Sequence, residues 1–196
     1  LPLRRAGLSY LNISLDTLNP RKFEEITRFP LLDNVLQGIR AARDAGFPVM
    51  KINVVAIRGF NDDELFGFAD FAHTENVELR FIEYMPFHGN GWSPNGFLSS
   101  DELKARLAER FELRPCNHAP AAAAKTFEIP GRRGKIGFIY QSLISHFFQQ
   151  AHRNNRDLHC PFTQQIDQRI RGESAKTQMQ IAFRPQPGIA QRLVSQ

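Results

Sequence analysis

The sequence predicts an α/β fold that begins with parallel βαβ units. Strand-like and helix-like periods alternate through the first 85 residues, which is the pattern of a parallel sheet with right-handed helical crossovers. The 196-residue chain has 42% hydrophobic and 23% charged residues. This composition is typical of globular domains and excludes collagen, coiled coil and wholesale disorder. Because so few strands cannot close a barrel, the units are interpreted as the second half of a larger architecture.

Three segments have strand periodicity. Residues 10–16 alternate apolar and polar side chains, whereas residues 49–55 and 77–82 are richer in apolar and β-branched residues, as expected for strands buried on one or both faces. A helical segment follows each of the first two strands. Asn19-Pro20 supplies an N-cap and a first-turn proline. We expect that first helical segment to be interrupted near Pro30.

Further elements follow from the same patterns. Residues 61–64 are an acid-rich helix start, and residues 99–111 predict another helix. Residues 86–94 are rich in Gly and Pro and predict a loop. Residues 121–129 and 135–140 are strand-like and flank a Pro-Gly turn, so they predict a hairpin.

We divide the chain into three parts. Residues 1–97 hold the βαβ units, residues 98–148 begin an incomplete α+β extension with the hairpin, and residues 149–196 form a divergent tail. The tail carries seven Arg and Lys against three Asp and Glu, most of the net charge of +5, and 10 of the 12 glutamines. Since the rest of the chain is nearly neutral, a solvated basic tail is favoured over a nucleic-acid surface.

Composition excludes several other classes. No stretch approaches the ~18 apolar residues that a membrane span needs, so no integral membrane protein is predicted. The two cysteines, Cys116 and Cys160, are too few for a disulfide framework, which favours a reducing cytoplasm. The chain opens at Leu1 without an initiator Met or a signal peptide, so we interpret it as a fragment.

Polar side chains recur on one face of each predicted strand. The outer face of a strand in a parallel α/β fold meets helices and is apolar, so a polar face indicates a barrel interior or cleft for anions or small polar ligands. Lys51 is the most informative, because an ammonium group among apolar neighbours is costly unless it is paired. The residues predicted to share a face are Asn12, Ser14 and Asp16 on one strand, Lys51 and Asn53 on the next, and Glu78 and Arg80 on the third.

These residues also have purely structural interpretations. A buried hydroxyl is commonly satisfied within a core, and methionine more often fills a core than contacts a ligand. The alternatives are Lys51 on an edge strand or paired with Glu78, Arg80 paired with Glu83 or Asp16, Ser14 as a core hydroxyl, and Met85 as core filling.

Several motifs occur in order along residues 3–146. Together they resemble the GTP 3',8-cyclase family of molybdenum cofactor biosynthesis, which belongs to the radical S-adenosylmethionine (SAM) superfamily. The motifs are Leu11-Asn12-Ile13-Ser14-Leu15-Asp16, Lys51-Ile52-Asn53-Val54-Val55, Arg58-Gly59-Phe60-Asn61-Asp62-Asp63-Glu64, Glu78-Leu79-Arg80-Phe81-Ile82-Glu83-Tyr84-Met85-Pro86, Gly89-Asn90-Gly91-Trp92 and Gly134-Lys135-Ile136-Gly137-Phe138-Ile139.

The resemblance implies a fold, a reaction and binding residues. It implies that residues 1–97 are the C-terminal half of a partial (β/α) TIM-type barrel. Ser14 and Met85 are expected to contact SAM, and Lys51 and Arg80 to contact GTP. The family is a lyase that converts GTP to (8S)-3',8-cyclo-7,8-dihydroguanosine 5'-triphosphate with 4Fe-4S clusters. Cyclic pyranopterin monophosphate synthase is expected to act next, with a homodimer as a possible assembly.

The sequence departs from the family at both iron–sulfur motifs. The N-terminal Cys-x-x-x-Cys-x-x-Cys motif that holds the SAM-cleaving cluster is missing. Where the family has Phe-Cys-x-x-Cys-Asn-Arg, this chain reads Phe148-Gln149-Gln150-Ala151-His152-Arg153-Asn154, and Cys160 is only a weak metal-ligand candidate. We therefore expect a truncated or frame-disrupted copy that is inactive alone, with no catalytic residue assigned. The alternatives are a non-catalytic GTP-binding module and an inert remnant.

Overall fold

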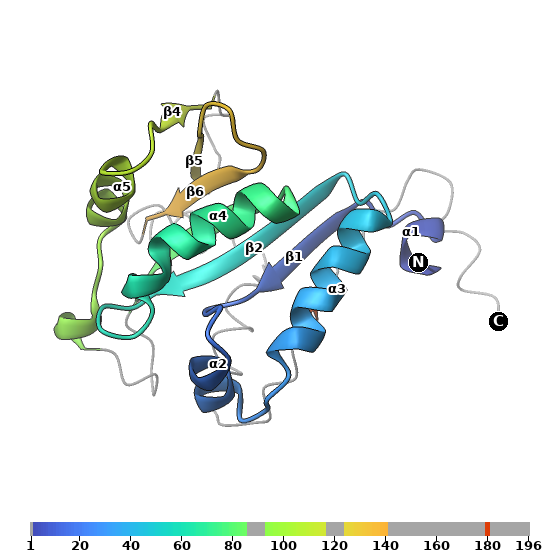
Figure 1. Cartoon of the computed structure of the whole chain (residues 1–196), viewed down its shortest axis with the longest axis horizontal. Coiled ribbons are helices and arrows are strands. Elements are labelled where there is room, and N and C mark those ends of the chain that lie inside the picture. The colour runs from blue at the N-terminus through green and yellow to red at the C-terminus, as the bar shows by residue number, and fades with distance from the viewer. Residues whose placement is uncertain (1, 86–92, 117–123, 141–178, 181–196) are drawn as a thin grey trace, which may run out of the picture.

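The fold is that of a computed structural model, which describes residues 2–85, 93–116, 124–140 and 179–180. Within these residues, seven strands form one sheet in the order β4-β5-β6-β3-β2-β1-β7. The strands are β1 (Tyr10–Ser14), β2 (Val49–Ala56), β3 (Glu78–Glu83), β4 (Arg114–Pro115), β5 (Lys125–Glu128), β6 (Lys135–Ile139) and β7 (Met179–Gln180). The helices are α1 (Pro2–Arg5), α2 (Pro20–Thr27), α3 (Leu32–Asp44), η1 (Asp62–Glu64), α4 (Leu65–Glu75), η2 (Pro94–Gly96) and α5 (Ser100–Ala108) (Figure 1).

The predicted parallel βαβ units are confirmed. β1 pairs in parallel with β2, and β2 pairs in parallel with β3. The connection from β1 to β2 carries α2 and α3, and that from β2 to β3 carries η1 and α4. The described part of the chain is therefore a mixed α/β fold, as the sequence predicts.

The break in the first helical segment also occurs where the sequence predicts it. The Asn19 side chain caps α2, because its Oδ1 accepts hydrogen bonds from the backbone N–H groups of Arg21 and Lys22. Pro20 is the first residue of the helix, where its missing N–H costs nothing. Pro30 lies in the connection to α3, since a proline ring clashes with a continuing helix.

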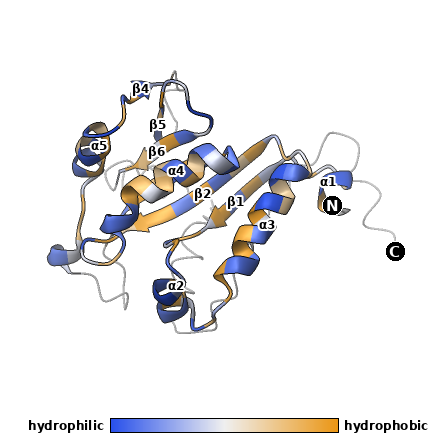
Figure 2. Ribbon diagram, viewed as in Figure 1, coloured by the Kyte–Doolittle hydropathy of each residue, from blue (hydrophilic) through white to orange (hydrophobic). Residues whose placement is uncertain are grey.

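The main core lies between the sheet and the helices. Alternate residues of β1 are buried, and α3 and α4 run alongside the sheet (Figure 1). Figure 2 shows that hydrophobic residues run along β1 and β2 and form a stripe on α3. Burial of these side chains is the main stabilising contribution to the fold. The buried residues of the strands include Leu11, Ile13, Ile52, Val54, Leu79, Phe81, Ile136 and Phe138, and those of the helices include Ile39, Phe68, Ala72, Leu103 and Leu107.

The predicted hairpin is confirmed, and it extends the same sheet. β5 and β6 are antiparallel, with Thr126 opposite Gly137. β6 also pairs in parallel with β3, which places Ile136 beside Leu79. This second pairing joins strands more than 50 residues apart, so no local pattern predicts it. The domain boundary at residue 97 stays a prediction.

Two predicted elements are shorter in the structure. α5 ends at Ala108, and a turn follows in which the N–H of Phe111 bonds to the carbonyl of Leu107. β1 ends at Ser14 rather than at residue 16. Two residues further on, the carboxylate of Asp16 accepts a hydrogen bond from the backbone N–H of Val55, at 3.0 Å. A side chain thus takes the place of a strand carbonyl as the acceptor.

Several predicted features fall outside the described residues. They are most of the loop at 86–94, Cys160, and the tail at 149–196 except for β7. Among the residues that the structure does describe, no helix has the length and hydropathy to cross a membrane.

Candidate functional site

The face of the sheet opposite the helices is polar along its middle. We call it the polar face and define it by three rows of residues that the strand register places side by side. The first row holds three charged residues and is called the charged row, the second is mostly polar and includes an arginine, and the third is apolar. The rows are Asn12, Lys51, Glu78 and Lys135; then Ser14, Asn53, Arg80 and Gly137; then Val55, Ile82 and Ile139.

Lys51 lies at the centre of the charged row. It is half-buried on β2, which lies between β1 and β3, so the edge-strand interpretation is wrong. Its Nζ lies 4.9 Å from the ring centroid of Tyr10, a cation–π contact. Among the described residues, no carboxylate lies within ion-pair distance of Lys51, although Glu78 is its register neighbour. The ammonium is therefore available to an anionic ligand.

Arg80 forms an ion pair with a partner that the sequence analysis did not name. Its Nε lies 2.6 Å from Oε1 of Glu78, two residues earlier on the same strand face. Its side chain also passes over Gly137, where a Cβ atom would come within 3.3 Å of the Arg80 Cγ. The glycine therefore leaves room for the arginine. Because the ion pair engages Nε, it leaves the terminal nitrogens of the guanidinium group as further donors.

The two residues expected to contact SAM lie at the carboxyl ends of their strands. Ser14 is half-buried at the end of β1 and is the register partner of Asn53. Met85 follows β3 and is 5% exposed. It packs with Val55, Ile82, Ala124 and Ile139 in a small apolar cluster separate from the main core. The structure therefore brings Ser14, Lys51 and Arg80 onto one face, with Met85 at the apolar end of that face. Their binding roles stay predictions.

Two asparagines were missed as candidate binding residues. The side-chain oxygens of Asn12 and Asn53 are buried, and no described residue donates a hydrogen bond to either of them. A buried acceptor without a donor is costly and uncommon. The sequence placed both residues on polar strand faces, but only the tertiary structure shows that their oxygens lack donors. Lys51 and Arg80 supply hydrogen-bond donors, and the two asparagine oxygens supply acceptors. This combination fits a ligand that carries both acceptors and donors, such as a nucleotide.

Asp16 lies beyond the end of β1, where its carboxylate bonds to a backbone group. It is 8% exposed, and its carboxylate bonds to the backbone of β2. Next to it in the sequence, the hydroxyl of Thr17 donates a hydrogen bond to the carboxylate of Glu64, which also accepts one from the ammonium of Lys22. These contacts fix the carboxyl ends of β1 and β2, so we assign them a structural role.

The residues present do not fit a 4Fe-4S cluster. The chain has two cysteines, fewer than the three thiolates that hold a SAM-cleaving cluster. Of these, Cys116 is half-buried with a free thiol, and Cys160 lies outside the described residues. The described ranges also contain no group of three or more His, Cys, Asp or Glu that could hold a metal ion.

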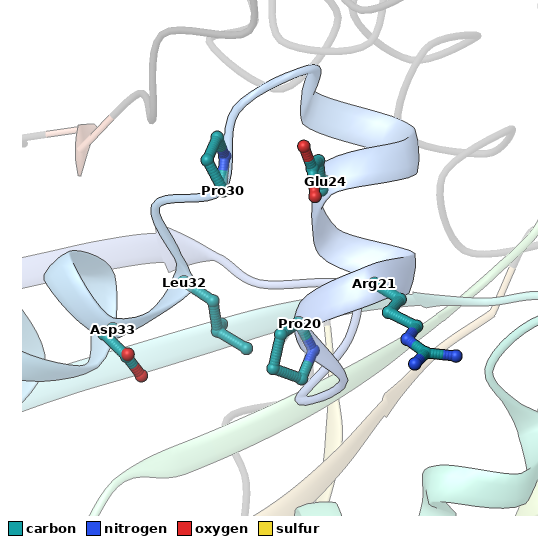
Figure 3. Close-up of a pocket in the computed structure, with 6 residues that line it drawn as sticks. All are labelled: Pro20, Arg21, Glu24, Pro30, Leu32 and Asp33. Carbon is teal, nitrogen blue, oxygen red and sulfur yellow. The ribbon is translucent and has the colours of Figure 1, made fainter.

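One surface pocket lies away from the polar face. It is lined by residues of α2, of α3 and of the connection between them (Figure 3). None of the four predicted binding residues contributes to it. Its lining residues are Pro20, Arg21, Glu24, Pro30, Leu32 and Asp33.

Comparison with known families gives two matches that follow one another along the chain. Residues 2–72 match the Radical SAM superfamily. Residues 77–153 match the family described as Molybdenum Cofactor Synthesis C. Residues 2–72 contain β1 and β2, and residues 77–153 contain β3 and the β5–β6 hairpin. The chain is thus a radical SAM protein.

The curated relatives narrow this class. The chain is 41% identical over 155 residues to the GTP 3',8-cyclase of Moorella thermoacetica, which covers 77% of this chain and 47% of the relative. It is 41% identical over 138 residues to the GTP 3',8-cyclase of Thermodesulfovibrio yellowstonii, covering 70% and 43%. It is also 41% identical over 152 residues to molybdenum cofactor biosynthesis protein 1 of Bos taurus, covering 77% and 24%. The chain belongs to the GTP 3',8-cyclase family and spans less than half the length of these relatives.

Proposed function

We propose that the chain forms the nucleotide-binding face of a GTP 3',8-cyclase and is inactive by itself. The observation that carries the proposal is the register of the sheet, which places Ser14, Lys51 and Arg80 in adjacent rows of one face. In the proposed architecture, the parallel strands are the C-terminal half of a partial (β/α) TIM-type barrel. The polar face would then line its interior, where such folds bind ligands near the carboxyl ends of the strands.

GTP is proposed to bind through its phosphates. Lys51 supplies a cation that no described carboxylate neutralises, and Arg80 supplies terminal guanidinium donors beyond its ion pair with Glu78. A guanidinium group can hold two phosphate oxygens at once, whereas an ammonium acts as a point charge.

SAM is proposed to bind toward the carboxyl ends of the strands. Ser14 offers a hydroxyl that donates and accepts hydrogen bonds. Met85 and the apolar row beside it offer a surface for an apolar part of the ligand. Such a division between polar and apolar contacts is typical of small-molecule sites.

In the complete family enzyme, SAM and the iron–sulfur clusters supply the radical chemistry that cyclises GTP. This chain lacks the cysteines for the SAM-cleaving cluster, so we propose for it only binding, orientation and shielding of the nucleotides. A non-catalytic GTP-binding module is therefore the second candidate function, and it is favoured by the same count of cysteines.

Calorimetry with GTP tests the binding proposal by comparing the GTP affinity of the Lys51→Ala and Lys104→Ala variants with that of the wild-type chain. Lys104 is a matched control, since it is also half-buried and its Nζ lies 4.6 Å from an aromatic ring centroid, but it belongs to α5. Loss of one charged contact is expected to weaken GTP binding about tenfold or more for Lys51→Ala. Lys104→Ala is expected to bind like the wild type.

Two results would contradict the proposal. One is the absence of saturable GTP binding by the wild-type chain. The other is an equal loss of affinity in both variants, which would indicate a nonspecific effect of charge or stability.

A further inference from the structure

Two asparagines of the fold are equally buried, but their hydrogen bonding differs. Asn53 and Asn61 are each 4% exposed. The side chain of Asn61 is fully engaged: its Nδ2 donates to the carbonyls of Asp16 and Val55, and its Oδ1 accepts from the N–H of Ile57. The Oδ1 of Asn53 has no donor among the described residues. Asn61 therefore has a structural explanation, and Asn53 Oδ1 does not.

The position of Asn53 points to a ligand. It lies in the second row of the polar face, with Ser14 and Arg80 as its register neighbours on either side. Of the three buried side-chain atoms without partners among the described residues, two belong to this face, Asn12 and Asn53, and the third is the hydroxyl of Ser100 on α5. Unsatisfied acceptors thus gather on the face that also presents Lys51 and Arg80.

The chemistry of the atom restricts what it can bind. A carboxamide oxygen only accepts hydrogen bonds. An ionised phosphate offers only acceptors, so Asn53 Oδ1 is unsuited to the group that Lys51 and Arg80 would hold. A nucleotide also carries donors, namely the ribose hydroxyls and the N–H groups of the base. The ribose lies next to the phosphates, so its hydroxyls are the donors nearest to the cationic part of the face.

We propose that Asn53 contacts the bound ligand directly and that its Oδ1 accepts a hydrogen bond from a ribose hydroxyl. This inference rests on the proposed function, because it takes the polar face to be the nucleotide site. A ribose is common to GTP and SAM, so both are sources of the same donor. Analogues of each ligand that lack one ribose hydroxyl distinguish the two sources.

The first test uses the wild-type chain and needs no substitution. Calorimetry compares GTP with its 2'-deoxy and 3'-deoxy analogues, and S-adenosylhomocysteine with its corresponding deoxy analogues. Removing the hydroxyl that donates to Asn53 Oδ1 is expected to weaken binding about tenfold, because the buried oxygen is again left without a donor. The affected ligand identifies the source of the ribose.

The second test repeats these titrations with Asn53→Leu, which keeps the branched shape of the side chain and removes its hydrogen-bonding atoms. The variant is expected to bind the parent nucleotide about tenfold more weakly and to lose the discrimination between hydroxyl and deoxy forms. Its thermal unfolding is expected to match that of the wild type, since no described contact of the Oδ1 is removed. Asn61→Leu is the matched control and is expected to unfold at a lower temperature.

The outcomes separate this inference from the proposed function. If GTP binds and Lys51→Ala weakens binding, but the deoxy analogues bind like their parents, only the role of Asn53 is overturned. Inosine 5'-triphosphate lacks the 2-amino group of guanine. If it binds more weakly than GTP while the deoxy analogues bind like GTP, the ribose assignment is also overturned. Absence of binding by any of the nucleotides would overturn both proposals.

Discussion

At the scale of single residues, Asn61 holds the carboxyl ends of two strands together. Its amide bridges the carbonyl groups of Asp16 and Val55 at 2.7 and 2.8 Å. Its Oδ1 accepts a hydrogen bond from the backbone N–H of Ile57, also at 2.8 Å. The turn after β2 is therefore built around one side chain, because backbone groups that leave a sheet need new partners.

We predict that Asn61→Ala lowers the free energy of unfolding by about 2–4 kcal/mol, because it leaves buried backbone groups without partners. Urea denaturation followed by circular dichroism measures the change. Asn34→Ala, at an exposed position of α3, is the control and should change stability by less than about 0.5 kcal/mol. Equal effects of the two substitutions would show that the Asn61 bridge is unimportant.

A second prediction at the residue scale concerns the ionisation of Tyr140, which follows β6. Burial raises the pKa of Tyr140 to about 12, and its hydrogen bond to Asp101 and the negative charges of Asp101 and Glu83 act in the same direction. The fold thus favours the neutral phenol. The corresponding stabilisation is fully present below the ordinary tyrosine pKa of 10.0. It is lost as the pH rises from there through about 12.

Titration of the phenolate absorbance measures this prediction. Among the three tyrosines of the chain, the component that ionises at the highest pH is expected to disappear in Tyr140→Phe. Circular dichroism recorded in parallel identifies the pH range in which the chain stays folded. If the high-pH component persists in the variant, it belongs to another tyrosine and the assignment is wrong.

At the scale of elements, the hairpin docks closely against the end of α4. The backbone N–H of Lys135 donates to the carbonyl of Val77, and that of Gly134 donates to the side chain of Asn76. Gly134 has a φ of +74°, and a Cβ atom there would lie 2.8 Å from the Val77 oxygen. Only glycine combines this backbone conformation with so close an approach.

Gly134→Ala is therefore predicted to destabilise the fold by about 2–4 kcal/mol through backbone strain and steric overlap. Gly131→Ala is the matched control in the same turn. Its φ is +75°, but a Cβ atom there would have no neighbour within 4 Å, so only the conformational cost of about 1 kcal/mol is expected. Chemical denaturation of both variants checks the difference, and similar losses would mean that the hairpin does not pack against α4.

At the scale of the whole molecule, the described sheet has a helical side and a polar side. The helical side holds the main core, and the polar side holds the charged and polar rows with the small Met85 cluster. The family relationship makes the polar side the proposed nucleotide site. Because the given sequence has two cysteines, we propose for this chain nucleotide binding without the iron–sulfur chemistry of the complete enzyme.

We predict that anaerobic reconstitution with iron and sulfide gives no turnover of GTP. Two cysteines cannot supply the three thiolates that leave one iron open to SAM. A cyclisation assay with SAM and a reductant measures product, and the GTP 3',8-cyclase of Moorella thermoacetica prepared in parallel is the positive control. Product formed by this chain at a rate near that of the control would refute the prediction.

Much of the fold follows from local pattern. Alternation at residues 10–16 predicts β1, the Asn19-Pro20 pair predicts the start of α2, and Pro30 predicts its separation from α3, because each signal depends on neighbours in sequence. The pairing of β6 with β3 depends on residues far apart in the chain. No local signal specifies it, so from sequence alone the hairpin is expected to belong to a separate extension.

The candidate site, too, could be predicted from the sequence only in part. Sequence periodicity alone determined that Ser14, Lys51 and Arg80 lie on polar strand faces, and the motifs determined the family. Only the tertiary structure decided that Glu78 pairs with Arg80, that Asp16 serves the backbone, and that Asn53 is buried with an oxygen lacking a donor. The physical reason is that a strand's period fixes the direction of a side chain, whereas its hydrogen-bond partners come from other strands and depend on register and burial.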